Sequence, residues 1–284
     1  MKKTISSAIV AIAFLTAVTW AQRPSQFRPG FNLFSKEQDV QLGQENAAQV
    51  RTQMTVIHDP VLTEYVNRVG KRLVAAREAQ ESGFPFTFEV VADPSINAFA
   101  LPGGPMFINT GLLRAVDNEA QLAAVMGHEM SHVILRHGTN QASKSRMIEL
   151  PLVLGSQIAG GSMAGQMAQL GIGLGANSVL LKFSRTAESQ ADLMGSHLMA
   201  ESGYSPIEMA RFFNKLNAQG GQRAPQFLSD HPNPENREKA IEQEIQRLPQ
   251  QKYGYETGEF QRMKQVVATI REPKPRPAAP VQAP

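Results

Sequence analysis

The sequence predicts an α+β fold in which helices predominate and one small β-sheet lies beside the central helix. Apolar residues recur at helical spacing over most of the chain between residues 35 and 271. The alternation of apolar and polar residues that is typical of strands is confined to residues 84–109. The span is large enough for one sizeable hydrophobic core, so we expect a single domain over residues 35–271.

Local signals predict the elements in order. Ser35 is suited to cap a first helix, and Pro60 to occupy the first position of a second. A Pro-Gly-Gly-Pro turn at 102–105 separates two strand-like segments. Asn233, followed by Pro234, is suited to cap a late helix. The expected helices cover residues 35–52, 60–80, 118–137, 182–202, 206–218, 233–247 and 258–270, and the expected strands cover 84–91, 96–101 and 106–109.

The two ends of the chain differ from this pattern. A basic N-terminus precedes an apolar run over residues 5–18, which is shorter than the ~20 residues of a membrane-spanning helix. We therefore predict a signal peptide over residues 1–21, cleaved after its last residue, and a linker at 22–34. The alternative is an uncleaved N-terminal anchor. The proline-rich residues 272–284 cannot form a packed core and are expected to be disordered.

Charge and cysteine content narrow the function. The chain has 28 basic and 25 acidic residues, and its net charge of +3 gives no indication of nucleic-acid binding. It contains no cysteine and therefore no disulfide. Together with the predicted signal peptide, these features favour the periplasm of a bacterium as the location.

The most informative motif is the pentapeptide His128-Glu129-Met130-Ser131-His132, which has the form H-E-x-x-H. Residues four apart lie on the same helical face, so the two imidazoles can bind one zinc ion per chain. Glu129 lies beside the metal, where it can accept a proton from water. The alternative is a helix that carries these residues by chance. Its apolar flanks favour the metal site, because buried polar side chains need a reason to lose their water.

A third protein ligand must come from elsewhere in the chain. The metzincin extension requires glycine at 135 and histidine at 138, and the chain has Leu135 and Gly138. We expect His137 to lie in the last helical turn, where its charge suits the helix dipole, and Gly138 to end the helix.

Glu188 and Asp192 are the candidates for the missing ligand, since they lie four apart on an expected helix. One carboxylate can bind the metal while the other accepts the free N–H of a ligand histidine. Most such pairs simply form a solvated helix face, which is the alternative. The small and apolar neighbours favour the functional interpretation. We predict that Glu188 is the third ligand and that Asp192 orients a ligand histidine.

Five segments occur in an order that resembles the zinc metallopeptidase family of HtpX and the CAAX prenyl endopeptidases. They are Asp59–Asn67, Asn97–Gly104, Ala124–His137, Glu188–Asp192 and Ser229–Arg237. The resemblance covers about residues 36–247 and is closest to the soluble periplasmic branch to which BepA belongs. It implies a zincin-type, gluzincin-like metalloprotease domain in which the ligands are His128, His132 and Glu188, and Glu129 is the base. The chain lacks the membrane spans of HtpX and the tetratricopeptide repeats of BepA.

Four further residues have candidate roles. In the strand at 96–101, Asn97 and Ala98 are predicted to bind substrate through the main chain, the alternative being an ordinary hairpin strand. A histidine before a proline usually serves a turn, but the family pattern places His231 near the metal. There it could stabilise an oxyanion or block the open zinc position, and Arg237 could share the first role.

The segment 150–181 has no charged residue and seven glycines. Its polar residues make it a poor lipid-facing helix. We expect a glycine-jointed cover over the cleft, and a peripheral membrane contact is the alternative.

These features predict a zinc-dependent endopeptidase of the periplasm. The resemblance implies unfolded or misassembled envelope proteins as its substrates. The rival hypothesis is a chaperone-like assembly factor that keeps the zinc site but cleaves little, in which the uncharged segment binds clients or covers the site. The intact Glu129 argues against the rival, because a scaffold has no need of a base.

Overall fold

The computed structural model describes residues 25–149, 183–219, 225–232, 236–249, 251–254 and 258–271. The predicted signal peptide, the uncharged segment 150–181, the cap at Asn233 and the proline-rich tail lie outside the described residues. The described part is mainly helical and contains a small mixed sheet, as predicted.

The described elements follow one another in chain order. They are α1 (Lys36–Gln53), β1 (Val56–Ile57), α2 (Pro60–Val74), α3 (Arg77–Ser82), β2 (Thr87–Val91), β3 (Ala98–Ala100), β4 (Pro105–Asn109), α4 (Thr110–Ala115), α5 (Glu119–Ile134), α6 (His137–Glu149), α8 (Arg185–Glu201), α9 (Ile207–Gln219), α10 (Gln226–Asp230), α11 (Arg237–Arg247) and α12 (Glu259–Thr269).

The sheet has the strand order β1-β2-β4-β3. The strands β2 and β4 are parallel, while β1 and β3 run antiparallel to their neighbours. Among the described strands, β3 pairs only with β4 and therefore forms an edge of the sheet. The turn between them includes Gly103 and Gly104, whose φ angles of 77° and 122° favour glycine.

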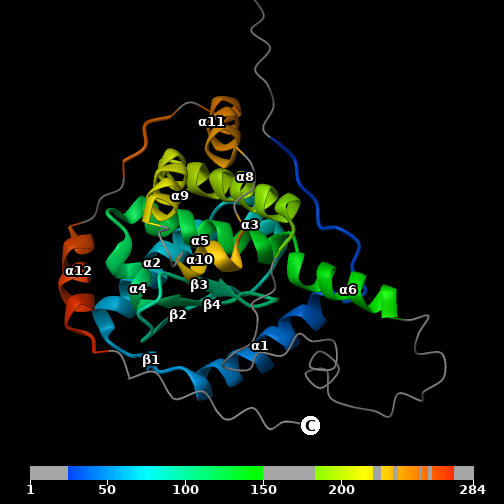
Figure 1. Cartoon of the computed structure of the whole chain (residues 1–284), viewed down its shortest axis with the longest axis horizontal. Helices are drawn as coiled ribbons and strands as arrows, with labels where there is room; N and C mark the ends of the chain where they lie inside the picture. The colour runs from blue at the N-terminus through cyan, green and yellow to red at the C-terminus, as the bar shows by residue number, and fades with distance from the viewer. Residues whose placement is uncertain are drawn as a thin grey trace, which may run out of the picture.

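Helices cover both faces of the sheet, as Figure 1 shows, with α1 below it and α5, α8 and α11 stacked above it. Alternate side chains of the strands point to the two faces. Phe88, Val90 and Ile108 join the large core under α2 and α5. Val91 and Phe107 instead pack with residues of α1 in a smaller apolar cluster.

The central helix α5 is almost entirely buried and lies across α8. Two glycines allow this close approach. A Cβ atom added to Gly195 would lie 3.1 Å from the backbone nitrogen of His128, and one added to Gly127 would lie 3.4 Å from the carbonyl oxygen of Gly195. The helix that carries the H-E-x-x-H motif and the helix that carries Glu188 are therefore neighbours because small residues occupy their crossing point.

Most expected elements are confirmed, and two helices end earlier than predicted. The expected helix over 60–80 is broken at Ala75–Ala76 into α2 and α3. The expected helix over 118–137 ends at Ile134, and Gly138 lies inside α6 instead of ending α5. The helix α6 and the short elements β1, α4 and α10 were not predicted.

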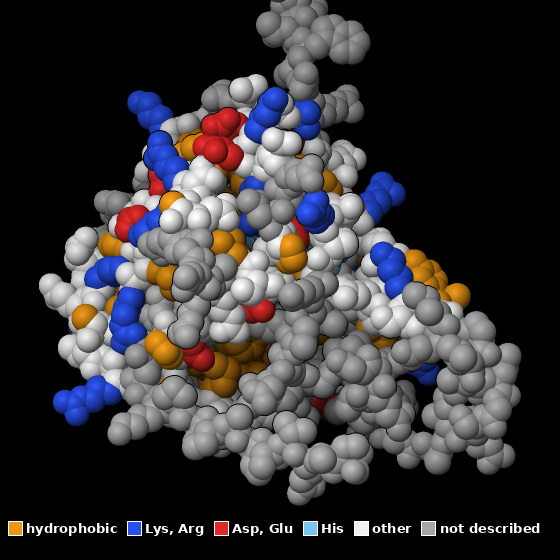
Figure 2. Space-filling view, viewed as in Figure 1, with side chains coloured by type: hydrophobic (Ala, Val, Ile, Leu, Met, Phe, Trp, Pro, Cys, Tyr) orange, Lys and Arg blue, Asp and Glu red, His pale blue; other side chains and the backbone are white. Residues whose placement is uncertain are grey.

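The surface near α6 is partly apolar. Met147 on this helix is 52% exposed, and Phe31 and Leu33 of the preceding N-terminal segment are 59% and 47% exposed. Figure 2 shows hydrophobic side chains exposed at the α6 end of the molecule. Within the described ranges, no helix combines the length and the apolar character that a membrane crossing needs.

Candidate metal centre

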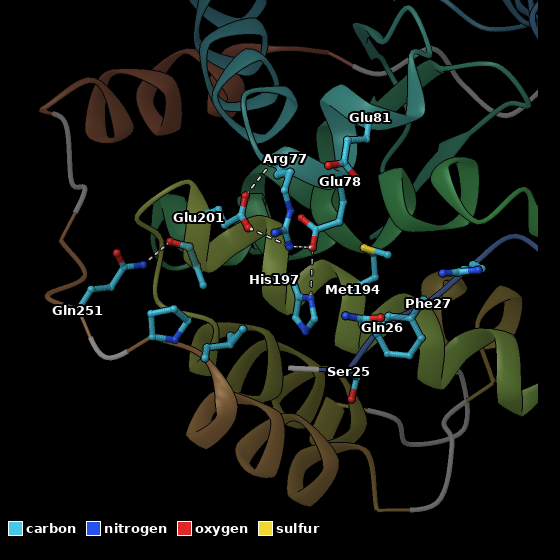
Figure 3. Close-up of a pocket in the computed structure, with 14 residues that line it drawn as sticks. Ser25, Gln26, Phe27, Arg77, Glu78, Glu81, Met194, His197, Glu201 and Gln251 are labelled. Carbon is cyan, nitrogen blue, oxygen red and sulfur yellow. Dashed lines mark hydrogen bonds and ion pairs between the residues drawn. The ribbon is translucent and has the colours of Figure 1, made fainter. Parts of the chain in front are cut away.

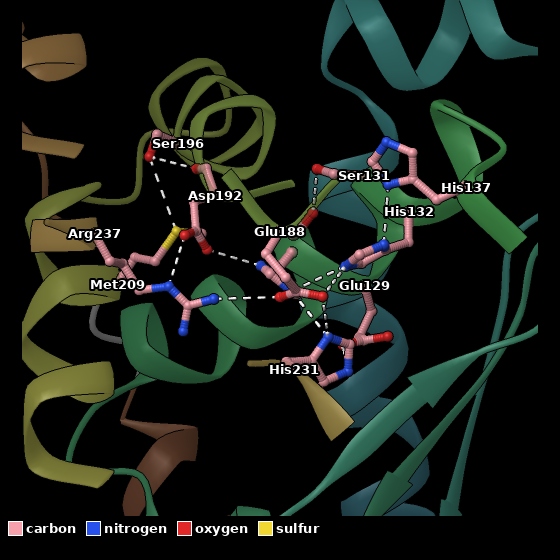
Figure 4. A network of polar contacts seen from close by, with 12 residues as sticks. Glu129, Ser131, His132, His137, Glu188, Asp192, Ser196, Met209, His231 and Arg237 are labelled. Atoms are coloured by element: carbon pink, nitrogen blue, oxygen red, sulfur yellow. Dashed lines mark hydrogen bonds and ion pairs between the residues drawn. The ribbon is translucent and has the colours of Figure 1, made fainter. Parts of the chain in front are cut away.

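Four buried side chains converge between α5, α8 and the residue after α10 (Figure 4). His128 and His132 come from α5, Glu188 from the first turn of α8, and His231 from the C-terminal cap of α10. One ligand atom from each lies within 4.8 Å of all the others. The predicted convergence of the H-E-x-x-H motif with Glu188 and His231 is present in the fold.

The distances within this cluster match a zinc site. The Nε2 atoms of His128 and His132 are 3.1 Å apart, and the Nδ1 atom of His231 lies 3.3 Å from Nε2 of His128. The carboxylate oxygens of Glu188 lie 3.3 Å from Nε2 of His128 and 3.2 Å from Nδ1 of His231. A tetrahedron with zinc–ligand bonds of 2.0–2.1 Å has edges of roughly 3.3–3.4 Å. The donor set thus has the size and the chemistry that zinc requires.

Contacts on the outer ring nitrogens turn both α5 histidines toward the same point. The Nδ1 atom of His128 lies 3.0 Å from Oδ1 of Asp192, which can only accept a hydrogen bond when ionised. The Nδ1 atom of His132 lies 3.0 Å from Nδ1 of His137. When Nδ1 of each ring donates outward and neither Nε2 atom carries a proton, the two Nε2 lone pairs face one another. A cation between them removes this repulsion, so the residues fit a metal ion.

The ionisable groups of the centre have strongly shifted pKa values. Burial opposes a charge on His128, but hydrogen bonds to Asp192 and Glu188 outweigh it and raise its pKa to about 9. Burial and the neighbouring positive rings hold the pKa of His132 well below its usual range. Burial likewise opposes the charge of Glu188, yet hydrogen bonds from His128 and His231 lower its pKa to about 2. The centre therefore keeps an ionised carboxylate and at least one neutral imidazole ready for a cation.

Glu129 lies between this cluster and the edge strand β3. Its Oε1 atom is 3.2 Å from Nε2 of His231, and its carboxylate is hydrogen bonded by the backbone of Ala100. The side chain is buried, and burial raises its pKa. A carboxylate with a raised pKa is better suited to accept and return a proton near neutral pH.

Arg237 lies on the carboxylate side of the cluster. Its Nε atom donates to Asp192 at 2.6 Å, and its Nη2 atom donates to Glu188 at 3.3 Å. The guanidinium also lies 4.2 Å from the ring centre of Phe213. These contacts hold Arg237 against the carboxylates of Glu188 and Asp192 (Figure 4).

Asn97 and Ala98 differ in their exposure to the free edge of β3. The backbone carbonyl of Asn97 accepts from Asn109, and its side chain bonds to Asp230 and to the backbone of Ala98. Hydrogen-bonded and non-hydrogen-bonded pairs alternate in an antiparallel ladder. Because the backbone carbonyl of Asn97 points toward β4, the backbone groups of Ala98 and Ala100 point the other way, toward the free edge. This edge lies next to Glu129, because the backbone of Ala100 is hydrogen bonded to the Glu129 carboxylate.

Four residues around the centre were not assigned by sequence reasoning. His137, expected to serve the helix dipole, is buried against His132 and contacts Gln190 at 3.1 Å. Phe183 stacks on the ring of His132 at 4.0 Å, and Phe227 stacks on the ring of His231 at 4.6 Å. These apolar rings exclude water from two sides of the cluster.

A separate pocket of about 610 Å³ lies away from the metal centre (Figure 3). It includes His197, whose Nε2 atom is 2.7 Å from Glu244 and whose Nδ1 atom is 3.6 Å from Glu78. Its two ring nitrogens point to separate carboxylates, so they cannot bind the same ion.

Comparison with known proteins identifies relatives of this chain. The model of Peptidase family M48 matches residues 60–245. The beta-barrel assembly-enhancing protease of Escherichia coli (strain K12) is 36% identical over 208 residues, which cover 70% of this chain and 42% of the relative. The mitochondrial metalloendopeptidase OMA1 of Schizosaccharomyces pombe is 31% identical over 226 residues, which cover 78% of this chain and 65% of the relative. The chain spans less than two thirds of the length of either relative.

Proposed function

Because this chain belongs to Peptidase family M48, a family of zinc metalloendopeptidases, we propose that it hydrolyses peptide bonds within unfolded or misassembled proteins of the cell envelope. The observation that carries the proposal is the convergence of the four-residue cluster with Glu129 beside the free edge of β3. The predicted signal peptide and the similarity to a bacterial envelope-assembly protease support the periplasm as its location.

In this proposal His128, His132 and Glu188 hold one zinc ion per chain. The ion supplies Lewis acidity, which polarises the scissile carbonyl and acidifies a water molecule. Asp192 accepts the outer N–H of His128 and so keeps that ring in the binding tautomer. Arg237 donates to both Glu188 and Asp192 and so holds the two carboxylates in place beside His128. The oxyanion role that the sequence suggested for Arg237 stays a prediction.

Glu129 is the general base in this proposal. It takes a proton from the water that attacks the scissile carbonyl and passes the proton to the leaving amine. Its position between the ligand cluster and β3 places it beside any peptide bound along that edge.

The edge of β3 is proposed to bind the substrate backbone. An extended peptide can add as a further strand by donating to the outward carbonyl oxygens of Ala98 and Ala100, whose N–H groups are bonded to Asn97 and Glu129. Such binding reads the backbone and not the side chains, so it suits unfolded segments of many sequences. Asn97 supports the strand from within, through its bonds to Asp230 and Ala98.

His231 lies in the place that a water or a substrate carbonyl would need. Its Nδ1 atom is 3.2 Å from Glu188 and 3.3 Å from Nε2 of His128, as a fourth ligand would be. We propose that this arrangement is a resting state and that the imidazole turns aside when substrate enters. From that position it could donate to the oxyanion of the tetrahedral intermediate.

The same observation favours the rival function. A centre that is permanently closed by His231 would act as a chaperone-like assembly factor that binds zinc and cleaves little. In either case the expected partners are envelope proteins, and the possibility of a peripheral membrane contact through residues 150–181 stays a prediction.

The test measures bound zinc and hydrolysis of a chemically unfolded β-barrel protein. The wild type, Glu129→Gln and His231→Ala are compared. We expect equal zinc in the wild type and Glu129→Gln but cleavage only by the wild type, because the amide cannot accept the proton. Equal, metal-independent cleavage by both would refute the assignment. Zinc binding without cleavage in the wild type and in His231→Ala would favour the assembly factor.

A further inference from the structure

We propose that His137 and Gln190 form a positioning pair that fixes the ring of His132 in the orientation needed to bind zinc. This inference rests on the proposed zinc site and extends it to two residues outside the ligand set. The Nδ1 atom of His137 lies 3.0 Å from Nδ1 of His132, and its Nε2 atom lies 3.1 Å from Oε1 of Gln190. His137 is only 8% exposed, so water does not readily replace either contact.

The contacts from Gln190 to His137 and from His137 to His132 determine which ring nitrogen of each histidine carries the proton. The carbonyl oxygen of Gln190 accepts a hydrogen bond, so Nε2 of His137 donates and its Nδ1 atom accepts. Nδ1 of His132 must then donate to His137, which leaves the Nε2 lone pair of His132 facing the cluster. The reverse direction would put an N–H of His132 against Nε2 of His128, where the cation has to lie.

The backbone is shaped to bring His137 back under His132. Residues five apart on a continuous helix do not lie on the same face. Here Arg136 interrupts the helix with a φ angle of 56°, in the left-handed region that favours glycine. Its side chain is held by Asp39 at 2.6 Å and by the carbonyl of Phe34 at 2.6 Å. The unusual conformation is therefore maintained by tertiary contacts, which is common beside functional sites.

Gln190 connects the pair to the other helix of the site. It lies on α8, two residues after Glu188, whereas His132 and His137 flank the junction of α5 and α6. His137 and Gln190 therefore connect the ligand His132 on α5 to α8, the helix that supplies the ligand Glu188. Outer partners of metal-bound histidines typically contribute 10–100-fold to metal affinity.

The experiment compares zinc affinities of the full chain by competition with a chromogenic chelator. His137→Phe keeps an aromatic ring beside Phe183 but removes the acceptor, so we expect zinc binding to weaken about 10–100-fold. His137→Asn retains an acceptor oxygen, and we expect it to recover most of the affinity. Gln190→Leu leaves the proton on His137 without an acceptor and should weaken binding by a smaller factor. His58→Phe, at an exposed histidine away from the metal centre, is the control.

The outcomes separate a positioning role from a packing role. Melting curves and circular dichroism of the zinc-free variants report folding. If His137→Phe does not fold, Gln190→Leu and His137→Asn still carry the test. Wild-type affinity in folded His137→Phe, or in Gln190→Leu when His137→Phe does not fold, overturns the pair, and so does an equal loss in His137→Asn and His137→Phe.

The same measurements distinguish this inference from the proposed function. Zinc binding by the wild type without cleavage overturns the proteolytic function, while the affinities of the variants still decide the role of the pair. Absence of zinc binding in the wild type overturns both.

Discussion

Two buried histidine networks, the metal centre and the contacts of His197, lie on opposite faces of α8. They compensate buried charge in different ways. Glu188 and His197 are nine residues apart, which places them about 180° apart around the helix. On one face, the ring nitrogens of His128, His132 and His231 point toward each other and toward Glu188. On the other face, the nitrogens of His197 point outward to Glu244 and Glu78, and Figure 3 shows the contact with Glu78.

The difference shows that the direction of the ring nitrogens decides which cluster needs an ion. His197 is satisfied by its two carboxylates. Burial opposes its charge, but their hydrogen bonds raise its pKa to about 9, and the pKa of each glutamate is lowered to about 2. Both ring nitrogens of His197 therefore have a carboxylate partner. The metal centre has more imidazoles than carboxylates at its middle: His128, His132 and His231 share the single carboxylate of Glu188, so a cation can take the place of their shared protons.

The largest expected effect is on zinc binding, and it appears when loss of a ligand on one face of α8 is compared with loss of a histidine on the other face. His132→Ala should weaken zinc binding by about 10³-fold or more and abolish cleavage, because one of three protein ligands is lost. His197→Ala should retain one zinc per chain, although it should lower stability. Zinc content and chelator competition on both variants provide the measurement. Loss of zinc in His197→Ala alone would contradict the contrast between the two networks.

Removal of zinc should lower stability by a smaller but measurable amount. At a free zinc concentration 1,000 times the Kd, binding stabilises the folded chain by about 4 kcal/mol. We expect a chelator to lower the melting temperature by roughly 8–16 °C. The ligand variant His132→Ala should show little response to the chelator, whereas His197→Ala should respond like the wild type. A wild type whose melting temperature ignores both zinc and chelator would contradict the metal site.

The His197 network should make stability depend on pH in a defined window. The ordinary pKa of 6.5 is raised to about 9, so the stabilisation is complete below pH 6.5 and is lost as pH rises through 9. The carboxylates act in the opposite direction. Their pKa values fall from 4.5 to about 2, so their contribution is complete above pH 4.5 and is lost as pH falls through 2. Stability from this network is therefore greatest between pH 4.5 and 6.5.

The measurement is urea unfolding at pH 6.5 and pH 9 with chelator present throughout. The loss attributable to His197 should be on the order of 2–3 kcal/mol. In His197→Gln this part of the pH dependence should disappear, while His58→Gln should behave as the wild type. An unchanged slope in His197→Gln would show that the ring is not held in its charged form.

The sequence predicted the parts of the site that depend on local spacing. The four-residue interval in H-E-x-x-H and the same interval between Glu188 and Asp192 each determine a helical face. Their meeting was predicted only through the family resemblance. In the structure it depends on the close contact of Gly127 with Gly195, which are 68 positions apart and carry no local signal of pairing.

The elements that were missed are those that tertiary contacts impose against local preference. Alanine is the best helix former, so a break at Ala75–Ala76 has no signal in the sequence. It exists because the backbone N–H of Arg77, at the start of α3, donates to Glu201 at the end of α8, and Arg72 donates to the carbonyl of Ser202. The role of His137 was also mispredicted, because tertiary contacts of Arg136 turn the chain and bring His137 beside His132.

The smallest effect that we predict concerns the edge strand, which neither histidine network includes. Ala100→Pro removes the backbone N–H that faces the free edge and Glu129. Proline is tolerated on edge strands, so the fold and the zinc content should be preserved. Because this N–H is hydrogen bonded to the carboxylate of Glu129, its loss leaves the base less well held, and we expect kcat/KM for an unfolded protein to fall about tenfold. Ala100→Val keeps the N–H and should cleave nearly as the wild type. An unchanged kcat/KM in the proline variant would show that the contact between the edge strand and Glu129 does not contribute to cleavage.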